Sequence, residues 1–207
     1  GVIKGLDHIA ALGADAIWLG PFYPSPMVDG GYDVADHCGV NPAMGRLEDI
    51  DRLIAAAHER GLSLMADLVF NHTADTHPWF EAAIAGDPDY RDFYVFADAR
   101  PDGSPPTNWL SFFGTPGWRW IPQRSQYVLT QFLPGQPGLN LRCPAVQEAL
   151  RGIVDVWCAR GLDGFRLDAV ASYLADEHCW HDNPAASAAA RACNPAPDNN
   201  PYAWQDH

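Results

Sequence analysis

The sequence lacks the features that mark membrane, disulfide-rich secreted and nucleic-acid-binding proteins. Its 207 residues include five cysteines, an odd number and never spaced as Cys-x-x-Cys, which argues against a disulfide framework or a zinc ribbon and for a reducing compartment. Thirteen Lys and Arg residues against 26 Asp and Glu residues give a formal net charge of −13, which repels nucleic acid and anionic membranes. No run is apolar enough to span a bilayer. We therefore predict a cytoplasmic protein with no nucleic-acid or membrane partner, and the sequence leaves its oligomeric state open.

An initiator Met and a signal-peptide pattern are also missing from the opening Gly1-Val2-Ile3-Lys4. This opening is typical of a helix interior and predicts a fragment of a longer protein. What the sequence does have is a globular composition, with 47% hydrophobic and 12% aromatic residues, and enough length for a sizeable core. A neutral polar substrate is compatible with the net negative charge of the chain.

Hydrophobic periodicity alternates between helix and strand along much of the chain. Helical spacing predicts helices over residues 3–12, 47–60 and 144–161, and short apolar runs predict buried strands at 16–19, 62–69 and 163–167. This alternation is typical of parallel strands joined by crossover helices. Residues 71–142 break the rhythm with Pro, Gly and aromatic residues and are too long for a loop, so they predict an inserted subdomain. The chain after residue 172 reads as mostly loop.

Three parallel strands do not make a complete sheet fold. A closed parallel barrel needs eight strands, and an open sheet of three leaves two bare edges. The pattern therefore predicts an incomplete α/β fold.

The stretch GLDGFRLDAV, residues 161–170, carries two charges in an apolar strand. Alternate strand residues share a face, so Arg166 and Asp168 point one way while Phe165 and Leu167 point towards the covering helices. Buried charges persist when they are paired or used. Asp168 ends its strand, where parallel barrels build active sites, and the neighbouring guanidinium favours an ionised carboxylate. Both readings stay open at this point: a structural ion pair, or a carboxylate nucleophile of glycoside chemistry.

Other polar groups stand at loop starts. His72 directly follows the strand at 62–69 and could donate to a substrate hydroxyl or be an ordinary loop histidine. In VDGGYD, Asp29 and Tyr32 flank two glycines, which allow close approach of a ligand, although the residues alone favour a turn with a solvated Asp and a packed Tyr. Neither the pair His72 and His77 nor the HCWH stretch at 178–181 has a convincing metal-ligand spacing.

Taken in order, these stretches resemble the α-amylase family of glycoside hydrolases, in its oligo-1,6-glucosidase and α-glucosidase branch. The matching motifs are AIWLGPFYPSP, GYDVAD, ADLVFNHT, HPWF, QFLPGQPGLN, GLDGFRLDAV and DNNPYAWQDH. The resemblance implies a partial (β/α)8 TIM barrel whose second to fourth βα units are present, with a small subdomain inserted after the third strand. Residues 1–70 and 143–207 would then be barrel, the latter continuing beyond the chain end, and 71–142 the inserted subdomain.

The resemblance also implies the catalytic groups. Asp168 resembles the nucleophile of the family and Arg166 the arginine that holds it. Ala169 stands where relatives carry valine for α-1,6 linkages and a smaller residue for α-1,4 linkages, which favours α-1,4 cleavage. The family's general acid, a glutamate after the fifth strand, has no matching motif in the chain, so we expect residues 1–207 alone to be inactive.

Five further residues resemble sugar-binding positions of the family. Asp29 matches the aspartate that grips the terminal glucose, Tyr32 its stacking platform, and His72 the histidine beside the scissile bond. Phe113 and Phe132 resemble two aromatic walls of the glucosidase pocket. The partner implied is a small α-glucoside or oligosaccharide.

No cofactor is implied within the chain, because the calcium or magnesium loop of this branch would precede Gly1. The function implied is a retaining α-glucosidase on short α-glucosides. The alternatives are a related transglycosylase or isomerase (a sucrose isomerase, trehalose synthase or phosphorylated-disaccharide hydrolase), a non-catalytic amylase-like transporter subunit, and a carbohydrate-binding protein.

Overall fold

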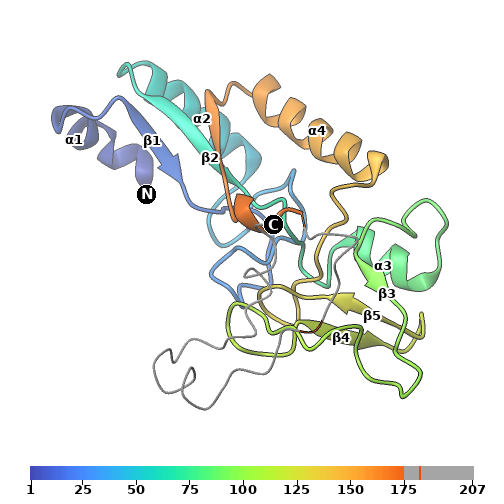
Figure 1. The fold of residues 1–207 in the computed structure, drawn as a ribbon. Helices are drawn as coiled ribbons and strands as arrows, with labels where there is room; N and C mark the ends of the chain where they lie inside the picture. The colour runs from blue at the N-terminus through green and yellow to red at the C-terminus, as the bar shows by residue number, and fades with distance from the viewer. Residues whose placement is uncertain (175–181, 183–207) are drawn as a thin grey trace, which may run out of the picture. The chain divides into compact units, whose positions relative to one another are not determined.

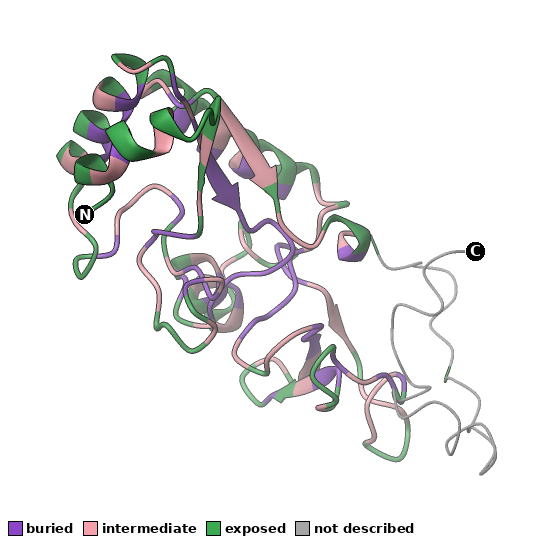
Figure 2. Cartoon of the chain, turned by 90° about the vertical axis from the view of Figure 1, so that its left-hand side faces the viewer, coloured by how far each residue is buried: buried purple, intermediate pink, exposed green. Residues whose placement is uncertain are grey.

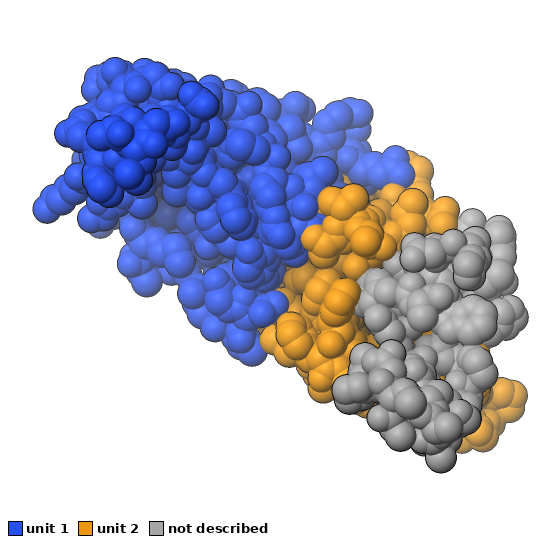
Figure 3. All heavy atoms as spheres, turned by 60° about the vertical axis from the view of Figure 1, so that its left-hand side comes forward, with its two compact units in different colours: residues 1–70, 147–168 blue, residues 71–146, 169–207 orange. Residues whose placement is uncertain are grey.

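The structure, a computed structural model, describes residues 1–174 and Asp182. Two compact units divide the chain: Gly1–Phe70 with Gln147–Asp168, and Asn71–Val146 with Ala169–His207. Figure 3 colours them separately. The predicted loop after residue 172 and the HCWH stretch lie, apart from residues 173, 174 and 182, outside the described residues. The predicted division at residues 70 and 142 stays a prediction.

A parallel sheet forms the centre of the first unit. Its strands are β1 (Ala16–Leu19), β2 (Ser63–Leu68) and β6 (Gly164–Leu167), in the order β1-β2-β6. Both pairings are parallel, with Trp18 opposite Met65 and Asp67 opposite Arg166. These are the three parallel strands that the sequence predicted. Because β2 is central, its residues are mostly buried (Figure 2).

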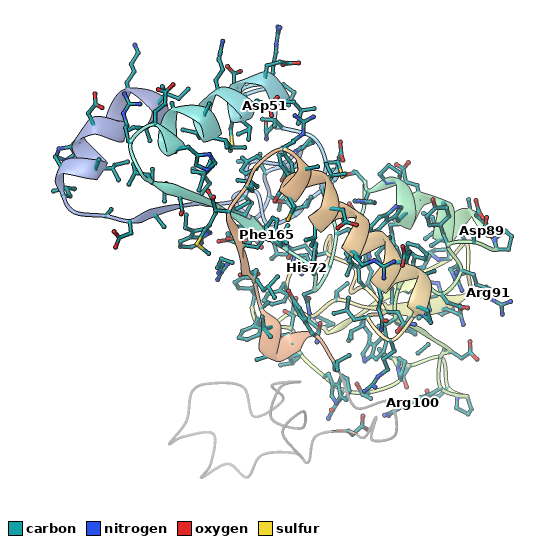
Figure 4. All side chains as sticks on the ribbon, turned by 90° about the horizontal axis from the view of Figure 1, so that it is seen from above. Asp51, His72, Asp89, Arg91, Arg100 and Phe165 are labelled. Carbon is teal, nitrogen blue, oxygen red and sulfur yellow. The ribbon has the colours of Figure 1, made fainter. Side chains whose placement is uncertain are left out.

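Helices pack beside this sheet (Figure 1). The chain begins with the short turn η1 (Val2–Gly5) and α1 (Leu6–Ala11). The longer helices are α2 (Leu47–His58) and α4 (Pro144–Ala159). Arg160, just after α4, donates to the carboxylate of Asp51 on α2 at 2.9 Å (Figure 4), which holds these helix ends side by side. The predicted apolar face of α2 is confirmed, since its buried residues are Ile50, Leu53, Ile54 and Ala57.

Burial at the two edge strands differs from the prediction. Trp18 on β1 is 51% exposed and Leu167 on β6 is 47% exposed. The sequence predicted buried strands at both places. The prediction was wrong because each of these strands has a neighbour on one side only within the described sheet. An apolar side chain on such an edge strand is left partly exposed, although the sequence pattern is that of a buried strand.

The second unit has its own antiparallel sheet, which the sequence did not predict. Strand β5 (Gln126–Leu129) lies between β3 (Phe96–Ala97) and β4 (Trp118–Ile121). Trp109, Trp118 and Leu129 form its hydrophobic cluster. Helix α3 (Pro78–Ala85) begins at His77, whose Nδ1 accepts a hydrogen bond from the backbone N–H of Trp79 at 3.1 Å. His77 is therefore an N-cap residue.

Three further observations concern the whole described chain. Its cysteines Cys38, Cys143 and Cys158 carry free thiols. None of its helices combines the length and apolar character needed to cross a membrane. Among residues 1–174 and Asp182, no three His, Cys, Asp or Glu side chains are grouped as metal ligands would be.

Candidate active site

Charged side chains gather where β2 and β6 end. Asp67 and Arg166 are register partners, so their side chains share one face of the sheet. Arg166 Nη1 donates to Asp67 Oδ1 at 3.0 Å and Oδ2 at 2.9 Å, and to Asp168 Oδ1 at 2.5 Å. The backbone N–H of Asp168 donates to the carbonyl of Leu68 at 3.0 Å. A single guanidinium nitrogen thus holds two carboxylates at the carboxyl ends of adjacent parallel strands.

The two carboxylates differ in exposure. The Asp67 side chain is fully buried, whereas the Asp168 side chain is 17% exposed and that of Arg166 is 40% exposed. Asp67 is therefore an internal ion-pair partner of Arg166, and Asp168 is the carboxylate of this pair of aspartates that a ligand can reach. The ring of Trp18 lies 5.1 Å from the Arg166 guanidinium carbon, a distance at which the ring face attracts the cation.

Electrostatics inside the cluster follow from burial and charge. Burial raises the pKa of Asp67 above its ordinary value, although Arg166 and the Tyr32 hydroxyl stabilise its ionised form. Burial lowers the pKa of Arg166, but hydrogen bonds and charge from Asp67 and Asp168 outweigh burial and leave that pKa raised. Arg166 therefore stays a cation at any working pH.

Tyr32 joins this cluster from the long loop after β1. Its hydroxyl donates to Asp67 Oδ2 at 3.1 Å, and its backbone N–H donates to the carbonyl of Asp29 at 3.0 Å. Burial and then the charge of Asp67 raise the pKa of Tyr32, so the phenol remains a hydrogen-bond donor. The structure thus brings the predicted residues Tyr32, Arg166 and Asp168 together around Asp67. Asp29 is joined to Tyr32 through the backbone turn alone.

The second unit holds His72 and the predicted aromatic residues. His72 (Figure 4) is 1% exposed, its Nδ1 lies 3.0 Å from Asn71 Oδ1, and its ring lies 5.0 Å from that of Phe132. Phe132 stacks on Phe112 at 5.1 Å. Phe113 is 58% exposed, with its backbone N–H donating to Ser111 Oγ at 3.2 Å. The structure thus joins His72 with Phe132 and leaves the Phe113 ring at the surface.

Asn71 anchors the segment around His72. Its Nδ2 donates to Gln131 Oε1 at 2.8 Å and to the carbonyl of Ser172 at 2.7 Å, all inside the second unit. Ala169, directly after Asp168, has a φ of 52° and a ψ of 35°. This left-handed conformation is uncommon for a residue other than Gly, Asn or Asp, and such strain clusters at functional sites.

Sequence reasoning missed Asp67. The signal was available, because Asp67 is a carboxylate inside the apolar run LSLMADLVF, as Arg166 and Asp168 are inside theirs. What the sequence could not show is that parallel pairing sets Asp67 opposite Arg166.

Barrel-type α/β enzymes build their sites at the carboxyl ends of parallel strands, and this chain carries its guanidinium-held carboxylate at such an edge. The chain belongs to the α-amylase family: the family model "Alpha amylase, catalytic domain" matches residues 1–205. The three parallel strands are accordingly part of a (β/α)8 barrel.

Individual relatives agree with this membership. The chain is 51% identical to a "Probable alpha-glucosidase" of Rhizobium meliloti (strain 1021), over 100% of the chain and 38% of that protein. It is 47% identical to the "Trehalose-6-phosphate hydrolase" of Escherichia coli (strain K12), over 82% of the chain and 31% of that protein. The crystal structure of the alpha-glucosyl transfer enzyme XgtA superposes with a TM-score of 0.89 at 47% identity, covering 100% of the chain and 39% of XgtA. The chain thus spans less than two fifths of these relatives' length.

Proposed function

We propose that the protein carrying this chain is a retaining α-glucosidase that acts on short α-glucosides. One observation carries the proposal: Asp168 directly follows β6 and is partly exposed, with its carboxylate Oδ1 2.5 Å from Arg166 Nη1. An ionised, oriented and accessible carboxylate is what a glycoside nucleophile requires. The similarity to an α-glucosidase at 51% identity supports the substrate class.

The chemistry would proceed in two displacements. An Asp168 oxygen forms a bond to the anomeric carbon while the bond from that carbon to the leaving oxygen breaks. A general acid protonates the leaving oxygen. Water then attacks the glycosyl-enzyme ester with the same group acting as base, and the anomeric configuration is retained. The family's acid is a glutamate about 5 Å from the nucleophile, and no motif of this chain matches it.

The sugar-binding roles are part of the same proposal. Asp29 would accept hydrogen bonds from sugar hydroxyls, and Tyr32 would offer its ring face, because its hydroxyl is already engaged by Asp67. His72 with Phe132 and Phe113 would contribute the further contacts that the resemblance implies. Ala169 favours α-1,4 over α-1,6 linkages. We propose that the reaction needs no cofactor and takes place in the cytoplasm.

The test uses the full-length protein that carries this chain. Maltose, isomaltose, sucrose, trehalose and trehalose 6-phosphate are supplied in parallel, and the anomer first released is identified by proton NMR. We expect maltose to be hydrolysed with release of α-glucose. Asp168→Asn should lower kcat by at least ~10³-fold, since it removes the nucleophile. Asp155→Asn, an exposed carboxylate on α4, is the matched control and should leave kcat within about twofold.

Other results would point elsewhere. Isomerised or transferred products in place of glucose would indicate the isomerase or transglycosylase alternative. Turnover that survives Asp168→Asn would contradict the assigned nucleophile. Maltose binding without turnover in the wild type would favour a carbohydrate-binding or non-catalytic subunit.

A further inference from the structure

One buried carboxylate of the first unit has no role in the chemistry above. Asp33 is 3% exposed and follows Tyr32 in the loop after β1. Its Oδ1 accepts from Ser25 Oγ at 2.8 Å and from the backbone N–H of Asp29 at 3.2 Å, and its Oδ2 accepts from the backbone N–H of Val28 at 2.9 Å. All three donors come from residues 25–29, so this carboxylate ties the loop back on itself.

Apolar burial does little to hold the tied segment. Met27 is 44% exposed and Val28 is 73% exposed, so neither anchors it by apolar burial. Met27 also has a φ of 62°, a left-handed conformation that an unbranched L-residue adopts only when its surroundings require it. Hydrogen bonds to an ionised carboxylate are shorter and stronger than neutral ones. One of these bonds, from the backbone N–H of Asp29 to Asp33 Oδ1, holds the backbone of Asp29 directly.

A tight turn transmits this restraint to Tyr32. The N–H of Tyr32 donates to the carbonyl of Asp29, and the two residues between them, Gly30 and Gly31, have φ values of 60° and 107°. Positive φ at both central positions is the demand of a type I′ turn, which favours glycine. An added Cβ on Gly31 would meet the carbonyl oxygen of Pro21 at 3.0 Å. Asp29 and Tyr32 are therefore the ends of one rigid turn.

We propose that Asp33 is a positioning residue that fixes Asp29 and Tyr32 in the orientation that binds the sugar. The proposal rests on the proposed function, because it assigns to Asp33 the preorganisation of that same sugar site. Asp33 touches no substrate. It acts through the backbone of residues 25–29, and its effect should appear in sugar affinity and leave the bond-making step alone.

Asp33→Asn in the full-length protein tests this directly. The amide keeps the volume of the carboxylate but has one accepting oxygen, so an Nδ2–H group would face one of the backbone N–H donors. We expect the KM for maltose and the Ki of a glucose-configured competitive inhibitor, deoxynojirimycin, to rise ~10-fold each, with kcat within about threefold of wild type. Asp36→Asn is the matched control. Asp36 accepts the N–H of Cys38 at 2.8 Å and takes no bond from residues 25–29, and its substitution should change neither constant.

A double-mutant cycle separates positioning from general loss of structure. If Asp33 acts through Asp29, Asp33→Asn should add less than about twofold to the KM of Asp29→Ala, because the same binding contact is already gone. Ser25→Ala, which removes one of the three donors, should raise KM less and in the same direction, and it serves if Asp33→Asn fails to fold. Additive effects, unchanged KM and Ki, or a fall in kcat with KM unchanged would each overturn the proposal. Failure of the proposed function would look different: turnover would be absent in the wild type or would survive Asp168→Asn.

Discussion

Removing the carboxylate of Asp67 should lower the free energy of unfolding, because this buried group pairs with Arg166. Asp67 accepts two contacts from Arg166 Nη1 and one from the Tyr32 hydroxyl, and its side chain is fully buried. Breaking a buried ion pair costs about 3–5 kcal/mol. The Arg166 side chain is 40% exposed, and water screens the pair, so about 2–3 kcal/mol is the expected loss for Asp67→Ala.

Catalysis should also suffer, because Asp67 helps to orient the guanidinium that holds Asp168. Arg166 would then be held by Asp168 alone, so the guanidinium would no longer be fixed from the β2 side. Because misplacement of a reacting group costs on the order of 10²-fold in rate, we expect kcat/KM to fall roughly 100-fold for Asp67→Ala. Asp67→Asn keeps one of the two acceptor oxygens and should therefore lower kcat/KM less than Asp67→Ala does.

The assay is steady-state hydrolysis of maltose by the full-length variants, combined with urea unfolding. Asp51→Asn is the matched control, because Asp51 forms an aspartate–arginine pair with Arg160 but is 47% exposed. It should change stability by no more than about 0.5 kcal/mol and leave kcat/KM unaltered. Full activity of Asp67→Ala, or an equal loss in Asp51→Asn, would refute the reasoning about burial.

The ionisation of Asp67 makes a further prediction about pH. Because burial raises its pKa above the ordinary 3.8, the folded protein binds this proton more readily than the unfolded chain. Stability from this group is therefore greatest below the ordinary pKa and is lost as pH rises from 3.8 through the raised folded pKa. Asp67→Asn should remove that component of the pH profile of the urea midpoint.

Two other substitutions test the local structure. Burial lowers the pKa of His37 from 6.5 to about 4, so its contribution to stability should be present above pH 6.5 and fall by about 3 kcal/mol as the pH drops to 4. His37→Gln should reduce the difference in unfolding free energy between pH 7 and pH 4.5, measured by urea unfolding. An unchanged difference would contradict the role given to His37. Ala169 has a φ of 52°, so Ala169→Gly should raise the free energy of unfolding by up to about 1 kcal/mol. Ala169→Val introduces a β-branched side chain and should lower the free energy of unfolding by more than about 1 kcal/mol. Equal stability of the two variants in urea unfolding would count against backbone strain at this position.

Sequence predicted the first unit well because its signals are local. Periodicity and terminal glycines set the bounds of α2 and α4 to within two residues. The same pattern gave the three parallel strands. Exposure of Trp18 and Leu167 was not predictable this way, since burial of a strand depends on its neighbours in the sheet and on no property of its own residues.

The second unit was harder to predict for a different reason. Its strands β4 and β5 are four residues each and pair across a turn at Ser125, which has a φ of 51°. Aromatic residues occur both in this short sheet and in its surrounding loops, so composition did not separate strand from loop. The candidate site divides similarly: Arg166 and Asp168 stand out in one decapeptide, while the partnership with Asp67 arises between strands 99 residues apart and needs the fold.

The most direct measurement of the central claim is the identity of the carboxylate that takes up the sugar. The full-length protein is incubated with 5-fluoro-α-glucosyl fluoride, whose glycosyl-enzyme ester hydrolyses slowly, and the peptic peptides are sequenced by mass spectrometry. We expect one fluoroglucosyl group per chain, on Asp168 within the GFRLDAV segment, and no label in Asp168→Asn. A label on a different carboxylate, or turnover of this probe with inverted configuration and no covalent adduct, would contradict it.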